Sequence, residues 1–304
     1  MNGFQDLPTD RIRVSPRHLG QMRRPDFCGH CFWYSVALGF RHPFEMSMPG
    51  ILFNMDRFEK ILVEAHFNSN KSAPKWLLSL GCKEPVAFPT KMTEDLPKLG
   101  LTLVGMPDAV FKKKDGSLVL VDYKTAKYKG ADDPFMPIYE TQLWGYARLL
   151  EHAGVGTVST AALVYFANTL SDYAENPLDL LTSEGLRVPF AVQIHEVKLN
   201  LPALNPLLKT FRDYADRSAP PESVAGCKVC KRLNYLFDLE YKRRNSEKMI
   251  SDLENRDSVM QRNLIWTLAN ERREARAHES IGWEGNLADS MSDATDCIPA
   301  AWDC

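Results

Sequence analysis

A buried strand that ends in charged residues is the strongest constraint in this sequence. Residues 118–124 are Leu-Val-Leu-Val-Asp-Tyr-Lys, a run typical of a strand that is covered on both faces. Asp122 and Lys124 stand two residues apart at its end, and another aspartate, Asp108, ends the preceding apolar segment. Charges at the end of a buried strand are locally unfavourable, and such exceptions tend to mark functional sites.

The turn between these two strands decides whether the aspartates meet. Residues 112–117 are Lys-Lys-Lys-Asp-Gly-Ser, which is typical of a hairpin turn. A three-residue loop with Gly116 in the left-handed conformation would set Asp108 opposite Asp122, with Lys124 on the same face. A two-residue loop would shift the register by one residue and separate the two acids. The sequence leaves both loops open, and the chemistry favours the first.

Facing aspartates predict a site for a divalent cation. Two carboxylates about 5 Å apart across neighbouring strands repel each other unless a cation joins them. Mg²⁺ takes oxygen ligands and is commonly held by one or two carboxylates together with waters and substrate phosphate. Such an ion can activate a water molecule, and Lys124 could orient that water or neutralise negative charge. The alternative is a salt-bridged hairpin whose charged ends are simply solvated.

The order of the remaining elements predicts an α/β fold. A strand, a helix of about 138–152 and a second strand imply a parallel pair joined by a right-handed crossover. We therefore expect a mixed central sheet flanked by helices. The predicted strands are 84–90, 99–112, 118–124, 157–167 and 190–199, and the predicted helices are 51–67, 74–80, 138–152 and 203–217. The first long helix is predicted from an apolar stripe of Ile51, Met55, Phe58, Leu62 and Ala65.

The motifs in this order resemble one nuclease family. Gly105-Met106-Pro107-Asp108, followed by Val121-Asp122-Tyr123-Lys124-Thr125, is similar to the PD-(D/E)xK nuclease superfamily. The RecB-like branch, which includes the CRISPR-associated exonucleases, is most similar, because a Gln-x-x-x-Tyr motif follows on the next helix. That motif is Gln142-Leu-Trp-Gly-Tyr146 in this chain. Gln142 and Tyr146 share one helical face.

The resemblance implies a fold and a set of roles. The fold would be restriction-endonuclease-like, and the activity would be Mg²⁺- or Mn²⁺-dependent cleavage of DNA, at ends or in single strands. Asp108 and Asp122 would hold the metal, Lys124 would serve the attacking water or the transition-state charge, and Gln142 and Tyr146 would position substrate. DNA repair, recombination or phage and defence processing are the processes that this family implies.

A further acid is expected on the helix before the hairpin. The family has an acidic or His position there, and the candidates in this chain are Asp56 and Glu59. Asp56 is preferred as the third metal ligand because it keeps a four-residue step to Lys60. An ordinary exposed acid is the alternative for either residue.

Two cysteine pairs stand almost at the two ends of the predicted domain. Cys28/Cys31 and Cys227/Cys230 are both CxxC motifs, and two such pairs complete a tetrahedral four-thiolate site. RecB-like exonucleases often carry a four-cysteine iron–sulfur cluster, usually with one N-terminal and three C-terminal cysteines. This chain has two and two, and four thiolates also suit Zn²⁺. The metal therefore stays open between zinc and an iron–sulfur cluster.

Net charge and composition limit the kinds of partner and the cellular location that the sequence predicts. The net charge is −2, so any nucleic-acid surface must be local, and Lys112, Lys113, Lys114, Lys127 and Lys129 are expected near the site. No apolar run reaches the roughly 20 residues of a membrane span, and the first residues lack a signal-peptide core. We expect a cytoplasmic protein without disulfides, since its seven cysteines are an odd number.

Four segments are predicted along the chain. Residues 1–24 form a lead-in, 25–236 the nuclease-like domain, 237–284 a charged helical extension and 285–304 a disordered acidic tail. The extension is a candidate docking arm for a protein partner. Two other functions remain open: a nucleic-acid-binding module that keeps the fold without turnover, and a structural subunit of a larger complex.

Overall fold

The computed structural model describes residues 12–41, 49–130, 132–254 and 269. They fall into two compact units. The first unit contains residues 1–37 and 44–221, and the second contains residues 38–43 and 222–304. The predicted tail and most of the predicted extension beyond residue 254 lie outside the described residues.

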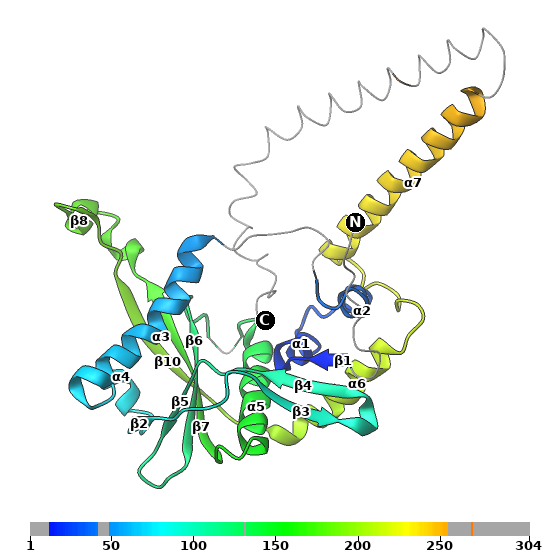
Figure 1. Cartoon of the computed structure of the whole chain (residues 1–304). Helices are drawn as coiled ribbons and strands as arrows, with labels where there is room; N and C mark the ends of the chain where they lie inside the picture. The colour runs from blue at the N-terminus through cyan, green and yellow to red at the C-terminus, as the bar shows by residue number, and fades with distance from the viewer. Residues whose placement is uncertain (1–11, 42–48, 131, 255–268, 270–304) are drawn as a thin grey trace. The chain divides into compact units, whose positions relative to one another are not determined.

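A five-stranded mixed sheet forms the centre of the first unit (Figure 1). The strands β6 (Leu118–Lys124) and β7 (Val158–Asn168) are parallel, and the other neighbouring pairs are antiparallel. The helix α5 (Met136–His152) joins β6 to β7, which is the predicted crossover. This confirms a mixed α/β sheet flanked by helices. Across the sheet the order is β10 (Phe190–Val197), β7 (Val158–Asn168), β6 (Leu118–Lys124), β5 (Ala109–Lys112) and β2 (Glu84–Pro85).

Alternation of side chains divides β6 between two faces of this sheet. One set, Val119, Val121 and Tyr123, is buried in a cluster with residues of α3 (Gly50–Asn70) and α4 (Lys75–Leu78). The other set, which includes Asp122 and Lys124, must therefore point to the opposite face. That face is the side of α5, where Gln142 lies within reach of Lys124.

The helix α3 turns a different face to the core than its apolar stripe suggests. Its buried residues are Glu59, Val63 and Phe67, which follow one another at four-residue steps. Of the predicted stripe, Phe58 is 54% exposed and Leu62 is 44% exposed. Apolar residues occur on both sides of this helix, so periodicity predicted the helix but could not decide its buried face.

Residues 12–21 differ from the expected lead-in, because they are built into the first unit. The strand β1 (Ile12–Val14) pairs in parallel with β4 (Leu101–Gly105), which pairs with β3 (Met92–Leu96) in a three-stranded sheet. The helix α1 (Pro16–Gln21) follows and packs closely on α5. A Cβ atom on Gly145 would lie 2.2 Å from Cγ of Pro16, so only glycine permits this approach.

The remaining elements of the first unit are short or peripheral. The helices α2 (Gly29–Ala37) and α6 (Leu204–Ala215) meet through edge-on rings, with the Phe32 and Tyr214 centroids 5.2 Å apart. The predicted polar loop at 170–188 contains two 3₁₀ turns and a small hairpin. Those elements are Leu170–Tyr173, Pro177–Leu180, β8 (Leu181–Thr182) and β9 (Gly185–Leu186). Two further 3₁₀ turns are Pro97–Leu99 and Leu201–Ala203.

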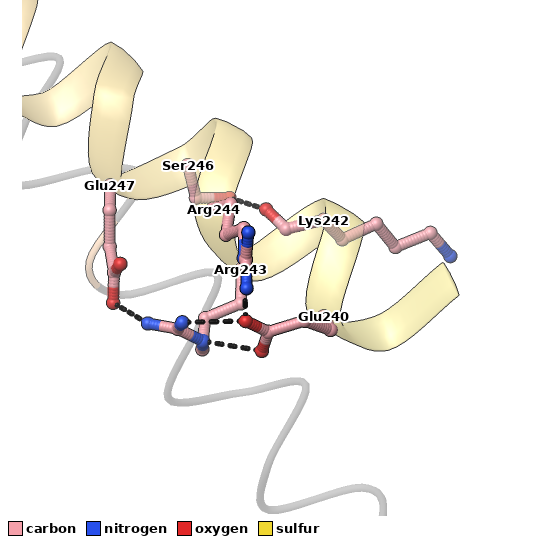
Figure 2. A network of polar contacts seen from close by, with 6 residues as sticks. All are labelled: Glu240, Lys242, Arg243, Arg244, Ser246 and Glu247. Atoms are coloured by element: carbon pink, nitrogen blue, oxygen red, sulfur yellow. Dashed lines mark hydrogen bonds and ion pairs between the residues drawn. The ribbon is translucent and has the colours of Figure 1, made fainter. Parts of the chain in front are cut away.

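The second unit contains one long helix, α7 (Lys228–Glu254). Its surface carries a charge network in which Arg243 bonds both Glu240 and Glu247, as Figure 2 shows. These pairs are three or four residues apart, so they support the helix itself. This helix begins at Lys228, before the start of the predicted extension at residue 237, and includes the extension's residues 237–254. Within the described ranges, no helix combines the length and apolar character needed to cross a membrane.

Candidate functional site

The hairpin has the register that brings the two aspartates together. The N–H of Lys113 donates to the carbonyl of Ser117 at 2.8 Å, and Gly116 has φ +85°. The loop therefore has three residues, as the metal-site prediction required. Ala109 pairs with Val121. Continuing this register by one residue sets Asp108 opposite Asp122.

Each aspartate of the pair is neutralised by a lysine. Oδ1 of Asp108 lies 2.8 Å from Nζ of Lys60, and its Oδ2 accepts the N–H of Tyr123 at 2.9 Å. Oδ2 of Asp122 lies 2.6 Å from Nζ of Lys124, and the Asp122 side chain is only 3% exposed. A buried carboxylate needs such a counter-charge. The sequence analysis used Lys60 only to choose Asp56 and did not predict its ion pair with Asp108.

Lys124 lies among acceptors from β6 and α5. Burial opposes its charge, but the carboxylates of Asp122 and Asp108 outweigh burial and hold the pKa of Lys124 above its ordinary value. Its Nζ lies 3.5 Å from Oε1 of Gln142, whose amide donates to the Tyr146 hydroxyl at 2.9 Å. Gln142 and Tyr146 are both buried. The motif on α5 therefore reaches the site through Lys124.

The two candidate acids on α3 occupy different environments. Asp56 is 54% exposed along its side chain and pairs with Lys60 at 3.2 Å. Glu59 is only 1% exposed, and its Oε1 accepts the hydroxyl of Thr125, just after β6, at 2.8 Å. The other oxygen, Oε2, is buried without a hydrogen-bond partner. An orphaned carboxylate oxygen of this kind is a candidate ligand atom.

Metal-free protein should lose stability as the pH rises between about 4.5 and about 7. Burial raises the pKa of Glu59 from 4.5 to about 7, so in this window the folded state keeps a proton that the unfolded chain releases. The contribution of protonated Glu59 to stability is complete below the unfolded-state pKa of 4.5 and is lost as the pH rises through the folded-state pKa of about 7. Glu59→Gln should flatten this part of the profile, measured as thermal unfolding midpoints in buffer without divalent salts. Equal slopes for the variant and the wild type would contradict this assignment.

The oxygen donors suit a hard divalent cation. The hairpin register sets Asp108 opposite Asp122, and Glu59 adds an unsatisfied oxygen on α3. Lys60 and Lys124 bring positive charge to the two aspartates. The carboxylate oxygens of the three acids are the donors that Mg²⁺ or Mn²⁺ prefers.

The lysines of the turn lie away from this site. Lys112, Lys113 and Lys114 were expected near the aspartates, but they lie at the opposite end of the hairpin. Asp122 is five residue steps along the chain from Ser117, which is about 17 Å at about 3.4 Å per residue. Two of these lysines line an open cavity of about 640 Å³, together with Lys71, Cys82 and Lys83. Lys127 and Lys129, by contrast, follow Lys124 directly.

The two cysteine pairs offer four thiols that could bind a metal. Cys28 precedes α2 and Cys31 lies in its first turn, and Cys227 and Cys230 stand in the same way at α7. The first pair belongs to the first unit and the second pair to the second unit. Four thiolates are the donor set of a structural zinc site or an iron–sulfur cluster.

Comparison with known proteins identifies the family. A family model described as "PD-(D/E)XK nuclease superfamily" matches residues 55–235, which is more than half of the chain. A solved structure entitled "Crystal structure of SSO0001" is similar at 11% identity and TM-score 0.35, covering 69% of this chain and 78% of that chain. That likeness is too low to support any argument. No curated protein matches the sequence. The family match includes both aspartates, Lys124 and the motif on α5, and this chain belongs to the PD-(D/E)XK nuclease superfamily.

Proposed function

We propose that this protein is a metal-dependent nuclease that hydrolyses DNA phosphodiester bonds. The observation that carries the proposal is the hairpin register, in which Asp108 stands opposite Asp122 with Lys124 on the same face. Repelling carboxylates at a strand end are the arrangement that a divalent cation stabilises. Membership of the nuclease superfamily supports the same reading.

Each residue has a role in this proposal. Asp108 and Asp122 hold Mg²⁺ or Mn²⁺, which when bound would lower the pKa of a water molecule and polarise the phosphate. Lys124 keeps its proton, since its pKa lies above the ordinary value, so it donates hydrogen bonds to the water or the phosphate oxygens. Gln142 and Tyr146 orient Lys124 through the bonds that link them.

Glu59, rather than Asp56, completes the metal site in our proposal. Glu59 is buried next to the end of β6 and has one oxygen without a partner, whereas Asp56 is half-exposed and ion-paired to Lys60. Lys60 then serves as the counter-charge of Asp108 before metal binds. Metal binding would have to displace the Lys60 ammonium group from Asp108. Asp56 already accepts a hydrogen bond from Lys60, so the ammonium group has a second carboxylate partner.

The finer assignments rest on the sequence motifs. We propose that the protein belongs to the RecB-like branch, because Gln142 and Tyr146 follow Lys124 on the next helix. We also propose that it acts on single strands or on DNA ends. The process would be DNA repair, recombination or phage and defence processing, in the cytoplasm. The nuclease-like domain is proposed as residues 25–236. A protein partner could dock on the exposed charged face of α7.

The four cysteines are proposed to hold a structural metal, either Zn²⁺ or an iron–sulfur cluster. Four thiolates satisfy the tetrahedral preference of zinc and equally the ligation of a cluster. Each CxxC begins a helix, and the positive end of a helix dipole favours the negative charge of metal-bound thiolates. Visible absorbance near about 400 nm in purified protein would indicate the cluster, and a colourless protein with bound zinc would indicate the other metal.

Digestion of end-labelled DNA tests the proposed function. Wild-type protein should degrade single-stranded DNA in Mg²⁺ or Mn²⁺ and stop when EDTA is added. Matched single-stranded, blunt duplex and circular substrates separate end-dependent from internal cleavage. Binding of DNA without degradation in either metal would instead favour a non-catalytic module, and neither binding nor degradation would favour a structural subunit.

A further inference from the structure

The ammonium group of Lys124 touches an aromatic ring that the family motifs do not include. Nζ of Lys124 lies 4.7 Å from the centroid of the Tyr139 ring, over its face. A cation within about 6 Å of a ring centroid is attracted by the negative face of the ring. Tyr139 belongs to α5, and the sequence analysis did not identify it because it lies outside the Gln-x-x-x-Tyr motif.

Tyr139 lies on the same face of α5 as the Gln-x-x-x-Tyr motif. Residues 139, 142 and 146 are separated by three and four positions, so their side chains line one side of the helix. The ring of Tyr139 is itself supported by Phe135, with centroids 6.4 Å apart and planes 24° apart. One helical face thus presents a fixed ring and a fixed amide to the same ammonium group.

Lys124 needs partners that do not compete with metal. Its four-carbon chain is flexible, and holding it in one conformation costs rotamer entropy. Its closest partner, Asp122, is also a proposed metal ligand, and a cation there would draw carboxylate charge away from the ammonium group. The Tyr139 ring and the Gln142 amide are neutral, so both can keep holding Lys124 while Asp122 serves the metal.

We infer that Tyr139 is a positioning residue that holds the Lys124 ammonium group over its ring face in the orientation needed for hydrolysis. The inference rests on the proposed nuclease function. The aromatic ring of Tyr139, and not its hydroxyl group, holds Lys124 in this role, because the ammonium group lies over the face of the ring. Tyr139 contacts neither the metal ligands nor the substrate in this role, so it should act on turnover rather than on DNA binding.

Replacing Tyr139 tests this role by kinetics. Tyr139→Leu should lower kcat on single-stranded DNA by about tenfold, equivalent to about 1.4 kcal/mol, with KM unchanged. Tyr139→Phe keeps the ring and should restore the wild-type kcat. Tyr173→Leu is the matched control, because Tyr173 is also half-buried in the same unit but lies in the 170–173 turn. It should leave both constants unchanged.

A fluorinated series separates attraction by the ring from simple packing. Phenylalanine with one, two or three ring fluorines at position 139 progressively weakens the negative face while nearly preserving shape. A stepwise fall in kcat along the series supports the inference, and a flat series overturns it. In metal-free protein labelled with ¹³C-lysine, the Lys124 ε-methylene signals should shift upfield under the ring and lose that shift in Tyr139→Leu. No shift in the wild type would also overturn it.

The two proposals can fail separately. If Lys124→Ala digests DNA as fast as the wild type, the proposed function is wrong. If Lys124→Ala is inactive but Tyr139→Leu keeps the wild-type kcat, the function stands and the role of Tyr139 is wrong.

Discussion

Lys124→Ala should lower the rate of metal-dependent digestion of single-stranded DNA by roughly 10²–10³-fold. Lys124 is the cationic donor at the end of β6 on the face of Asp122, and its side chain is only 17% exposed. A charged donor that is fixed before the reaction and shielded from water stabilises developing negative charge most strongly. The initial rate at saturating Mg²⁺ measures this loss.

The control for this change lies in the turn at the opposite end of the hairpin. Lys114 is exposed there, so Lys114→Ala removes the same charge without touching the aspartates and should keep the wild-type rate. Removing Lys124 leaves the buried Asp122 without its partner, and the unfolding midpoint must be compared alongside. Lys124→Met keeps most of the stem and should be as inactive as the alanine variant. A Lys124→Met protein that is folded and fully active would contradict the proposed role.

Cys230→Ser should cause the largest loss of stability. Cys230 is 4% exposed and is one of the four cysteines proposed to hold the structural metal. Structural zinc contributes on the order of 10 kcal/mol of binding free energy in small zinc peptides. Losing a third of this would lower the unfolding midpoint by about 10 °C in a domain of this size. Metal content per chain, measured by elemental analysis, should fall together with the midpoint.

Cys82→Ser is the matched control for the metal site. Cys82 is 3% exposed, so it is as buried as Cys230, but it lies in the apolar cluster beneath α3 and α4. Burial raises the pKa of the Cys82 thiol to about 12, so it stays a neutral thiol at physiological pH. This variant should keep the full metal content. Full metal content in Cys230→Ser would contradict the four-cysteine site.

Local rules predicted a hairpin but left two loop lengths open. The expected metal chemistry favoured the three-residue loop with Gly116 in the left-handed conformation, and the structure has that loop and its register. The crossover helix and the parallel strand followed from element order and handedness. Lys124 was identified in the same way, because it stands at an even spacing from Asp122.

Features that depend on tertiary contacts were not predictable in this way. The apolar stripe of α3 is exposed while Glu59 is buried, because the choice of face depends on what packs against the helix. The lysines of the turn were expected near the site because they are close to the aspartates in sequence. In a hairpin, however, the turn and the open end lie at opposite ends of the two strands, and the aspartates are at the open end. The ion pair of Lys60 with Asp108 and the contact of Lys124 with Tyr139 join residues far apart in the chain.

The most direct test of the central claim compares wild-type protein with Asp122→Asn on end-labelled single-stranded DNA. The amide keeps the size of the side chain but removes the charge that would hold the metal beside Lys124. The initial rates are measured across a Mg²⁺ titration, with DNA binding in EDTA as the check that the variant is folded. We predict rapid, Mg²⁺-dependent digestion by the wild type and no measurable digestion by Asp122→Asn with DNA binding retained. Digestion by Asp122→Asn at the wild-type rate and with the same Mg²⁺ dependence would contradict the account.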